Sequence, residues 1–426
     1  MAKPVGPICN LQCSYCFYLD KERLYPSPHT FKMSEEVLSQ YIRQYIDSQP
    51  GPEVSFAWQG GEPTLLGTAY FRRIVELQRE FGAGRTVTNS LQTNGTLLDD
   101  EWCQFLGDEH FLVGISVDGP RELHDRYRVD RKQQPTFDRV MRGIELLKRH
   151  QVAFNTLTVV HRENARQPLD VYRFLKGIGA QHMQFIPLVE RTGESGQLSA
   201  PPMADEPAAS VTPWSVLPRD YGDFLVTVFN EWVQRDVGQI FVQTFEVALG
   251  NWMGLGSSLC IFAETCGHAV ALEHNGDVYS CDHYVFPRYK LGNVLEDSLH
   301  ALASLPEQKR FGDAKRDTLP GYCRTCEVRF DCNGECPRNR FLHTPDGQPG
   351  LNYLCEGYRH FFRTIDPAMK ELAKLLRSGR PAAEIMHPPK AAPSPRLTAS
   401  PSGIARNAAC PCGSGRKFKR CHGRSA

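Results

Sequence analysis

The chain has 426 residues, of which 41% are hydrophobic and 23% are charged, and its formal net charge at pH 7 is +1. This length suits about two or three globular domains, and a charge so near zero argues against general binding of nucleic acid or anionic membranes. Neither a membrane span nor an export signal is recognisable, so we expect a cytoplasmic protein whose fifteen cysteines bind metal rather than form disulfides.

Short apolar strands alternate with helices along the first half of the chain. The predicted strands, rich in Val, Ile, Phe and Thr as buried parallel strands are, are Met1–Pro4, Val54–Trp58, Thr86–Thr93, Phe111–Val117, Val152–Val160 and His182–Val189. The helices predicted between them are Glu35–Ser48, Ala69–Phe81, Asp99–Leu106, Phe137–His150 and Gln167–Gly177. Six such units predict an α/β fold, a partial (β/α)6 barrel over residues 1–235. Active sites of such barrels lie at the carboxyl ends of the strands.

The second half of the chain is less regular. A polar surface loop is expected at Gly193–Pro218, and helices are expected at Asp220–Asp236 and Pro367–Ser378. Cysteines crowd into residues 236–379, which we interpret as a second module. A proline-rich linker then covers 380–403, and a small basic tail covers 404–426.

Three cysteines directly after the first predicted strand are the most informative motif. Cys9, Cys13 and Cys16 have the spacing C-x3-C-x2-C. A [4Fe–4S] cluster normally takes four thiolates, so a loop that offers three leaves one iron open for chemistry. This spacing indicates chelation of S-adenosylmethionine (SAM) by the open iron and generation of a radical. A zinc knuckle is the alternative.

A Gly-Gly-Glu-Pro sequence, made of Gly60, Gly61, Glu62 and Pro63, follows the second predicted strand. Two glycines allow the backbone to approach a ligand closely, and the carboxylate could bind the methionyl ammonium of SAM. A plain turn is the alternative. Downstream of the three-cysteine loop, the functional interpretation is favoured.

Polar groups also follow the next two strands. Asn94 lies in Gln-Thr-Asn-Gly, while Ser116 and Asp118 lie in Ser-Val-Asp-Gly. They could contact the carboxylate or ribose of SAM, or the substrate. For Asn94 and Asp118, a role as helix N-cap is an equal alternative.

The second module contains eight further cysteines, enough for two fully ligated [4Fe–4S] clusters. They are Cys260, Cys266, Cys281, Cys323, Cys326, Cys332, Cys336 and Cys355. One or two structural zinc sites are the alternative. Cys103 falls in a helical pattern without a partner, and it is given no role.

Asp282 directly follows Cys281, so its carboxylate must lie near that ligand. It could act as a general base if it reaches the substrate. A solvated Asp near the hairpin turn Asn275-Gly276-Asp277 is the alternative.

At these motifs the sequence resembles radical SAM enzymes with a SPASM domain and, more narrowly, anaerobic sulfatase-maturating enzymes. The resemblance covers Met1 to about Leu376 and includes Met-Ala-Lys-Pro, Gln-Thr-Asn-Gly-Thr, Ser-Val-Asp-Gly-Pro and Cys-Asp-His-Tyr-Val. The ligand pattern C-x9-G-x4-C is met by Cys266, Gly276 and Cys281.

The resemblance implies three [4Fe–4S] clusters and SAM as cosubstrate. It assigns one auxiliary cluster to Cys260, Cys266, Cys281 and Cys336, and the other to Cys323, Cys326, Cys332 and Cys355. It also makes Asp282 the base. The reaction would convert a Cys or Ser of an unfolded sulfatase polypeptide to Cα-formylglycine, with electrons from a flavodoxin- or ferredoxin-type donor.

The basic tail resembles a SEC-C zinc motif. Its zinc ligands would be Cys410, Cys412, Cys421 and His422. The tail from Gly403 has six basic residues and no acidic one, so it could dock on a protein or on ribosomal RNA. A passive folded tag is the alternative.

Three other functions remain open at this point. The nearest is another SPASM peptide-modifying enzyme, such as a thioether-forming maturase. A non-catalytic electron carrier would not need a loop of only three thiols. A zinc-dependent adaptor would be colourless when purified.

Overall fold

The structure is a computed structural model that describes residues 1–25, 30–192, 210–387, 405, 407–410 and 414–421. Residues Met1–Met386 form one compact unit and His387–Ala426 form a second, and each is described by itself. Within the described ranges, no helix has both the length and the apolar character that crossing a membrane requires.

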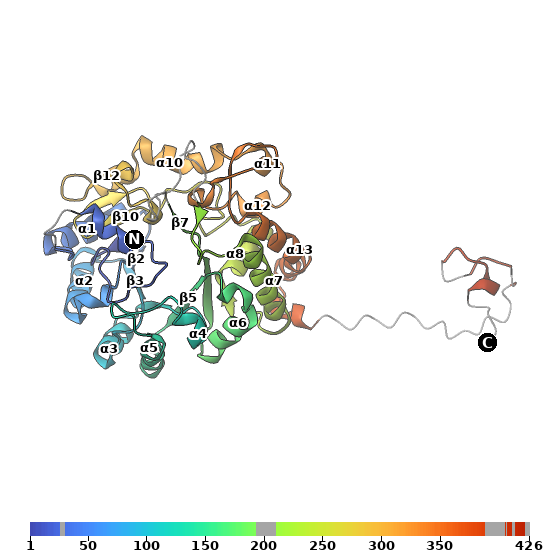
Figure 1. Ribbon diagram of the computed structural model, residues 1–426, viewed down its shortest axis with the longest axis horizontal. Coiled ribbons are helices and arrows are strands. Elements are labelled where there is room, and N and C mark those ends of the chain that lie inside the picture. Colours follow the sequence, from blue (N-terminus) through green and yellow to red (C-terminus); the bar gives the residue numbers. More distant parts are fainter. Residues whose placement is uncertain (26–29, 193–209, 388–404, 406, 411–413, 422–426) are drawn as a thin grey trace. The chain divides into compact units, whose positions relative to one another are not determined.

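A ten-stranded sheet with the order β12-β11-β10-β1-β2-β3-β4-β5-β6-β9 lines the inside of the first unit (Figure 1). Neighbours from β10 to β9 are parallel, whereas β10, β11 and β12 pair antiparallel. The strands are β1 Ala2–Lys3, β2 Glu53–Trp58, β3 Thr86–Thr93, β4 Leu112–Ser116, β5 Phe154–Val160, β6 His182–Pro187, β9 Phe241–Val242, β10 Ala271–Glu273, β11 Asp277–Tyr279 and β12 Lys290–Asn293. The parallel α/β barrel expected from the sequence is thereby confirmed.

Helices cover the outer face of this curved sheet (Figure 1). They are α1 Glu35–Ser48, α2 Thr68–Phe81, α3 Asp100–Asp108, α4 Arg121–His124, α5 Phe137–Arg149, α6 Pro168–Gly177, α7 Pro218–Arg235 and α8 Gln243–Trp252. Local signals start two of them, since Ser34 accepts a hydrogen bond from Val37 N at α1 and Asp99 accepts one from Trp102 N at α3. Buried aromatic side chains such as Trp58, Phe71 and Phe105 fill the layer between sheet and helices.

The sheet continues across the boundary expected near residue 235, because β10 pairs in parallel with β1. The hairpin β10–β11, which precedes Cys281, therefore extends the barrel sheet. Sequence patterns did not show this pairing, since the two strands lie about 270 residues apart along the chain. The pairing brings the residues after β11 next to the residues after β1.

Apart from β7 and β8, the remaining helices and strands belong to the cysteine-rich part of the chain. The remaining elements are β7 Arg191–Thr192, β8 Ser210–Val211, α9 Leu299–Ala303, α10 Pro306–Asp317, α11 Gly321–Arg324, α12 Arg329–Cys332, β13 Leu342–His343, β14 Pro349–Leu351 and α13 Cys355–Arg377. Helix α13 begins twelve residues before the predicted start at Pro367, which lies inside it. It packs on α7 where Gly357 meets Gly222. A Cβ on Gly357 would lie 2.0 Å from Pro218 O, so only a glycine allows the two helices to approach this closely. Of the predicted loop Gly193–Pro218, residues 193–209 lie outside the described part of the chain.

Candidate active site

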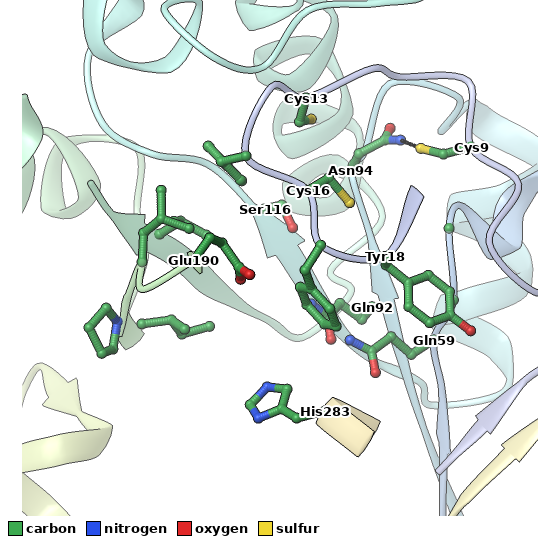
Figure 2. Close-up of a pocket in the computed structure, with 18 of the residues that line it drawn as sticks. Cys9, Cys13, Cys16, Tyr18, Gln59, Gln92, Asn94, Ser116, Glu190 and His283 are labelled. Carbon is green, nitrogen blue, oxygen red and sulfur yellow. Dashed lines mark hydrogen bonds between the residues drawn. The ribbon is translucent and has the colours of Figure 1, made fainter. Parts of the chain in front are cut away.

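A cavity of about 260 Å³ lies at the carboxyl ends of the barrel strands (Figure 2). Successive strands each contribute a wall residue at or next to their carboxyl ends: Lys3, Gln59, Thr93, Ser116, Val159 and Pro187. The three-cysteine loop forms part of the same wall. The cavity is therefore located where the barrel predicts chemistry to occur.

Cys9, Cys13 and Cys16 all line this cavity (Figure 2). Backbone bonds hold their loop in place, with Gln12 N donating to Val129 O at 2.8 Å and Ser14 N donating to Tyr127 O at 3.2 Å. The pKa of Cys9 and of Cys13 is raised to about 12, chiefly by burial and in smaller part by the neighbouring thiols. Thiols gathered this way need a bound cation to ionise, and coordinated iron supplies that charge. The loop therefore fits an iron–sulfur cluster.

The two glycines of Gly-Gly-Glu-Pro allow β2 and the cysteine loop to approach each other. A Cβ on Gly61 would lie 2.0 Å from Ile8 O, and Gly61 N donates to Gly6 O at 2.8 Å. Gly60 has a φ of 135°, which other residues rarely adopt. Both glycines also line the cavity, as a ligand-binding role requires.

Glu62 and Pro63 differ from the glycines in that neither lines the cavity. The Glu62 carboxylate is completely buried and accepts hydrogen bonds from Thr64 N and Oγ1, Thr93 Oγ1 and Asn94 N, at 2.6–3.1 Å. Burial raises the pKa of Glu62, and these bonds offset part of the rise. By these hydrogen bonds Glu62 holds the turn that contains Glu62 and Thr64 against the end of β3.

Asn94 and Ser116 do line the cavity, at the ends of β3 and β4. The Asn94 amide donates to Cys9 Sγ at 3.7 Å and to Asn10 Oδ1 at 2.8 Å (Figure 2). Its carbonyl oxygen accepts from Thr96 N at 3.0 Å, which is a turn contact rather than a helix cap. Asn94 therefore contacts the cysteine loop directly.

Asp118 is fully buried and does not line the cavity. Its carboxylate accepts from Tyr15 Oη at 2.5 Å, Arg128 Nε at 3.0 Å and Val159 N at 3.1 Å. Burial acts to raise the pKa of Asp118, but the charge of Arg128, two neighbouring histidines and the Tyr15 hydrogen bond together hold the pKa below its usual value. Because Tyr15 belongs to the cysteine loop, Asp118 fixes that loop to the barrel.

Asp282 lies behind the cavity wall rather than in it, and it forms an ion pair with Lys3, which does line the cavity. The Lys3 ammonium also lies 3.6 Å from the centre of the Tyr18 ring. Burial acts to raise the pKa of Asp282, but the positive charges around it, of which Lys3 is the strongest, together keep the pKa below its usual value. The carboxylate is thus kept ionised close to the cavity.

The eight cysteines of the second module fall into two groups. In the first, burial is the main cause that raises the pKa of Cys281 and of Cys336. Cys260 and Cys266 raise the pKa of Cys281 further by their charge, and Cys281 does the same for Cys336. In the second, Cys323, Cys326, Cys332 and Cys355 line a single small cavity. The ligand sets implied by the family resemblance divide the cysteines in the same way, and they stay a prediction.

Within the described ranges, no three His, Cys, Asp or Glu side chains are arranged to hold a single metal ion. A four-iron cluster places its thiolates differently, because each thiolate binds a different iron of the cube. The number of thiols in each group therefore fits iron–sulfur clusters. Each group of the second module has four thiols, and the barrel loop has three.

Comparison with known proteins identifies the family. Residues 4–175 match the radical SAM superfamily, residues 260–327 match an iron–sulfur cluster-binding domain, and residues 406–424 match the SEC-C motif. The chain is 46% identical to the serine-type anaerobic sulfatase-maturating enzyme of Bacteroides thetaiotaomicron, over 91% of this chain and 94% of that enzyme. It is 33% identical to the cysteine-type enzyme of Clostridium perfringens, over 88% of this chain and 98% of that enzyme.

The chain belongs to the family of anaerobic sulfatase-maturating enzymes. A solved structure of native anSMEcpe with bound AdoMet and Cp18Cys peptide matches this family member with a TM-score of 0.77. That match has 32% sequence identity and covers 88% of this chain and 98% of the other. The family resemblance and the fold inferred from the sequence are both confirmed.

Sequence reasoning missed several residues of this sulfatase-maturating enzyme's cavity wall, among them Tyr18, Gln59, Glu190, His283 and Arg338. Gln59 had a usable signal, since it directly precedes Gly-Gly-Glu-Pro at the end of a strand. Glu190 and Arg338 had none, because they meet across 148 residues of chain.

In the tail of this family member, Cys410 is buried and Cys410 N donates to Arg416 O at 2.8 Å. Cys421 Sγ lies 3.4 Å from Ser414 Oγ. The predicted zinc ligands Cys412 and His422 lie outside the described residues, as does most of the predicted linker.

Proposed function

We propose that this chain is an anaerobic sulfatase maturase that oxidises a Ser or Cys in an unfolded sulfatase segment to Cα-formylglycine. The main support is that one strand-end cavity is lined by the three-thiol loop and by Lys3, the ion-pair partner of Asp282. The serine- and cysteine-type relatives support the reaction, and the structure with a bound Cys peptide supports a polypeptide substrate.

We propose three [4Fe–4S] clusters held by the three cysteine groups, with SAM bound at the cluster of the barrel loop. When bound, this group supplies the electron that cleaves SAM and yields the 5′-deoxyadenosyl radical that takes a Cβ hydrogen from the substrate. Gly60, Gly61, Asn94 and Ser116 line the cavity, where they would contact SAM. Glu62 and Asp118 would act one layer further out by holding the glycine turn and the cysteine loop.

The chain's own contribution to the chemistry is positioning and proton transfer. Asp282 accepts the proton of the substrate thiol or hydroxyl, and Lys3 keeps that carboxylate ionised beforehand. Cys281, the residue next to Asp282, would help to hold the auxiliary cluster that would accept the electron left on the substrate. Proton and electron would then leave the substrate on the same side of the cavity.

The partners follow from this chemistry. A low-potential one-electron donor of the flavodoxin or ferredoxin type must reduce the barrel cluster. We also propose that the tail binds zinc through its three cysteines and His422, and that its basic residues dock on a protein or on ribosomal RNA. Loss of zinc, but not of iron, on deletion of residues 404–426 would support the tail assignment.

The test is anaerobic incubation of the reconstituted enzyme with SAM, a reductant and matched peptides that contain either Ser or Cys. Formylglycine gives a mass loss of about 2 Da from Ser or about 18 Da from Cys, together with a trappable aldehyde. SAM cleavage with formation of an intramolecular thioether would favour a different peptide-modifying SPASM enzyme. Absence of both SAM cleavage and peptide change from an iron-loaded preparation would contradict the proposal.

A further inference from the structure

One arginine joins the two sides of the cavity. Arg338 lies in the short 3-10 helix Pro337–Asn339, two residues after Cys336, and its side chain lines the cavity. Its guanidinium forms an ion pair with Glu190 and donates to Val189 O at 3.3 Å. Both residues follow the end of β6, so the bond connects the barrel to the cysteine-rich module.

The same guanidinium also reaches the three-cysteine loop. The Arg338 guanidinium carbon lies 5.1 Å from the centre of the ring of Phe17, which directly follows Cys16. The Phe17 ring also contacts His283, and the centres of these two rings lie 5.6 Å apart in an edge-on arrangement. One side chain thus contacts the barrel loop and lies beside a ligand of the auxiliary group.

The ion pair between Arg338 and Glu190 is largely buried. The Arg338 side chain is 18% exposed and that of Glu190 is 5% exposed, so the ion pair is only weakly screened by water. Cys336 lines the same cavity as Arg338, so the guanidinium charge lies at the cysteine group to which Cys336 is assigned.

We propose that Arg338 is a positioning residue that sets the spacing between the radical-generating loop and the first auxiliary group, while its charge favours electron acceptance there. This inference rests on the proposed function. In the reaction, the Cβ radical of the substrate loses one electron to the oxidised auxiliary cluster, and the thiol or hydroxyl proton goes to Asp282. A nearby positive charge raises the reduction potential of a cluster, and Glu190 tempers that effect.

The experiment compares R338Q, R338K and E190Q in the reconstituted full chain. Reduction potentials of the auxiliary clusters are followed by EPR in a Cys13→Ala background, so that the barrel cluster does not contribute. Product per SAM cleaved is measured without that substitution. R173Q is the matched control, because Arg173 pairs with Glu231 on the outer helices and is 53% exposed.

We expect R338Q to lower the auxiliary potential and E190Q to raise it, since one removes a positive charge and the other a negative one. In R338Q, formylglycine per SAM cleaved should fall on the order of 10- to 100-fold, as misplaced reactants do. R338K should keep the potential but not the product ratio, because an ammonium lacks the fork that holds Glu190 and Val189 together. R173Q should match the wild type in both.

Unchanged potentials in R338Q and E190Q, or shifts of both in the same direction, would overturn the role of the charge. A normal product ratio in both R338Q and R338K would overturn the positioning role. If R338Q does not fold, E190Q and R338K still decide the question. Failure of the proposed function is distinguishable, because the wild type would then make no formylglycine whatever the potentials of the variants.

Discussion

Lys3 forms an ion pair with Asp282, and this pair joins the first barrel strand to the residue next to Cys281. The Lys3 side chain is only 1% exposed, and its ammonium also lies over the ring of Tyr18. Tyr18 in turn donates to Glu273 Oε1 at 2.5 Å. The pair exists because β10 adds to the sheet beside β1, which places the following hairpin at the cavity.

The first prediction concerns catalysis by Asp282. Replacement by Asn keeps the shape of the side chain but removes the charge that accepts the substrate proton. We expect formylglycine formation to fall roughly 10²–10⁴-fold, while SAM is still cleaved. Formylglycine and 5′-deoxyadenosine are quantified in the same reaction, and wild-type product yield from D282N would remove Asp282 from the role of base.

The second prediction concerns the stability of the pair. K3M leaves a carboxylate without its cation at a mostly buried position, which costs about 3–5 kcal/mol in comparable pairs. The double variant K3M/D282N removes both charges, so it should be more stable than K3M alone. Urea unfolding of the metal-free chain measures this. R173M is the control, because Arg173 is 53% exposed in its pair with Glu231, and it is expected to cost about 0–1 kcal/mol. Additive losses in the double variant would show that the two charges do not interact.

The third prediction assigns Glu62 a structural role. In E62Q, an amide NH₂ would replace an oxygen that accepts either from the Thr93 hydroxyl or from Asn94 N, leaving a buried donor unpaired. We expect a loss of about 1–3 kcal/mol in the free energy of unfolding of the metal-free chain. Unchanged stability combined with loss of SAM binding would instead place the carboxylate on SAM.

The fourth prediction is a pH dependence of stability from His124. Burial lowers the pKa of His124 from 6.5 to about 3, and the charge of Arg128 adds to this effect. Between these values the unfolded chain binds a proton that the folded chain does not. The free energy of unfolding therefore falls as the pH drops below about 6.5, by up to about 1.4 kcal/mol per pH unit.

Urea unfolding at several pH values between about 7 and about 5 tests this dependence. H124Q should show a shallower slope than the wild type, because its side chain cannot take up a proton. H300Q, in which an exposed His of α9 is replaced, should keep the wild-type slope. Equal slopes in all three chains would contradict the assignment to His124.

The fifth prediction concerns the cysteine groups. C332A removes one of four thiols around the small cavity of the second group, so the reconstituted protein should lose about one cluster of four irons. C103A is the matched control, since Cys103 is buried in α3 away from the cysteine groups. Iron and sulfide analysis measures the difference, and full iron content in C332A would exclude the cysteine as a required ligand.

The local features of the fold were predictable from the sequence. Strand β3 and helix α1 have the predicted bounds, and in the structure Ser34 caps the start of α1 by accepting a hydrogen bond from Val37 N. The three-cysteine loop was also correctly placed at a strand end. These predictions depend on residues close together in the sequence.

Long-range relationships were not predictable in the same way. The pairing of β1 with β10, and hence the Lys3–Asp282 contact, depends on sheet assembly across most of the chain. The helix expected at Pro367 begins at Cys355 instead, because packing against α7 tolerates a proline inside it. Glu62 and Asp118 illustrate a further limit, since a strand-end carboxylate can face a ligand or hold a neighbouring loop, and only the structure distinguishes the two.

The most direct test of the account follows the hydrogen taken from the substrate. A sulfatase peptide deuterated at Cβ of its target Ser is incubated anaerobically with the reconstituted enzyme, SAM and a reductant, and the 5′-deoxyadenosine is examined by mass spectrometry. The account predicts that 5′-deoxyadenosine gains one deuterium as the peptide becomes formylglycine. Formylglycine formed while 5′-deoxyadenosine remains unlabelled would contradict it.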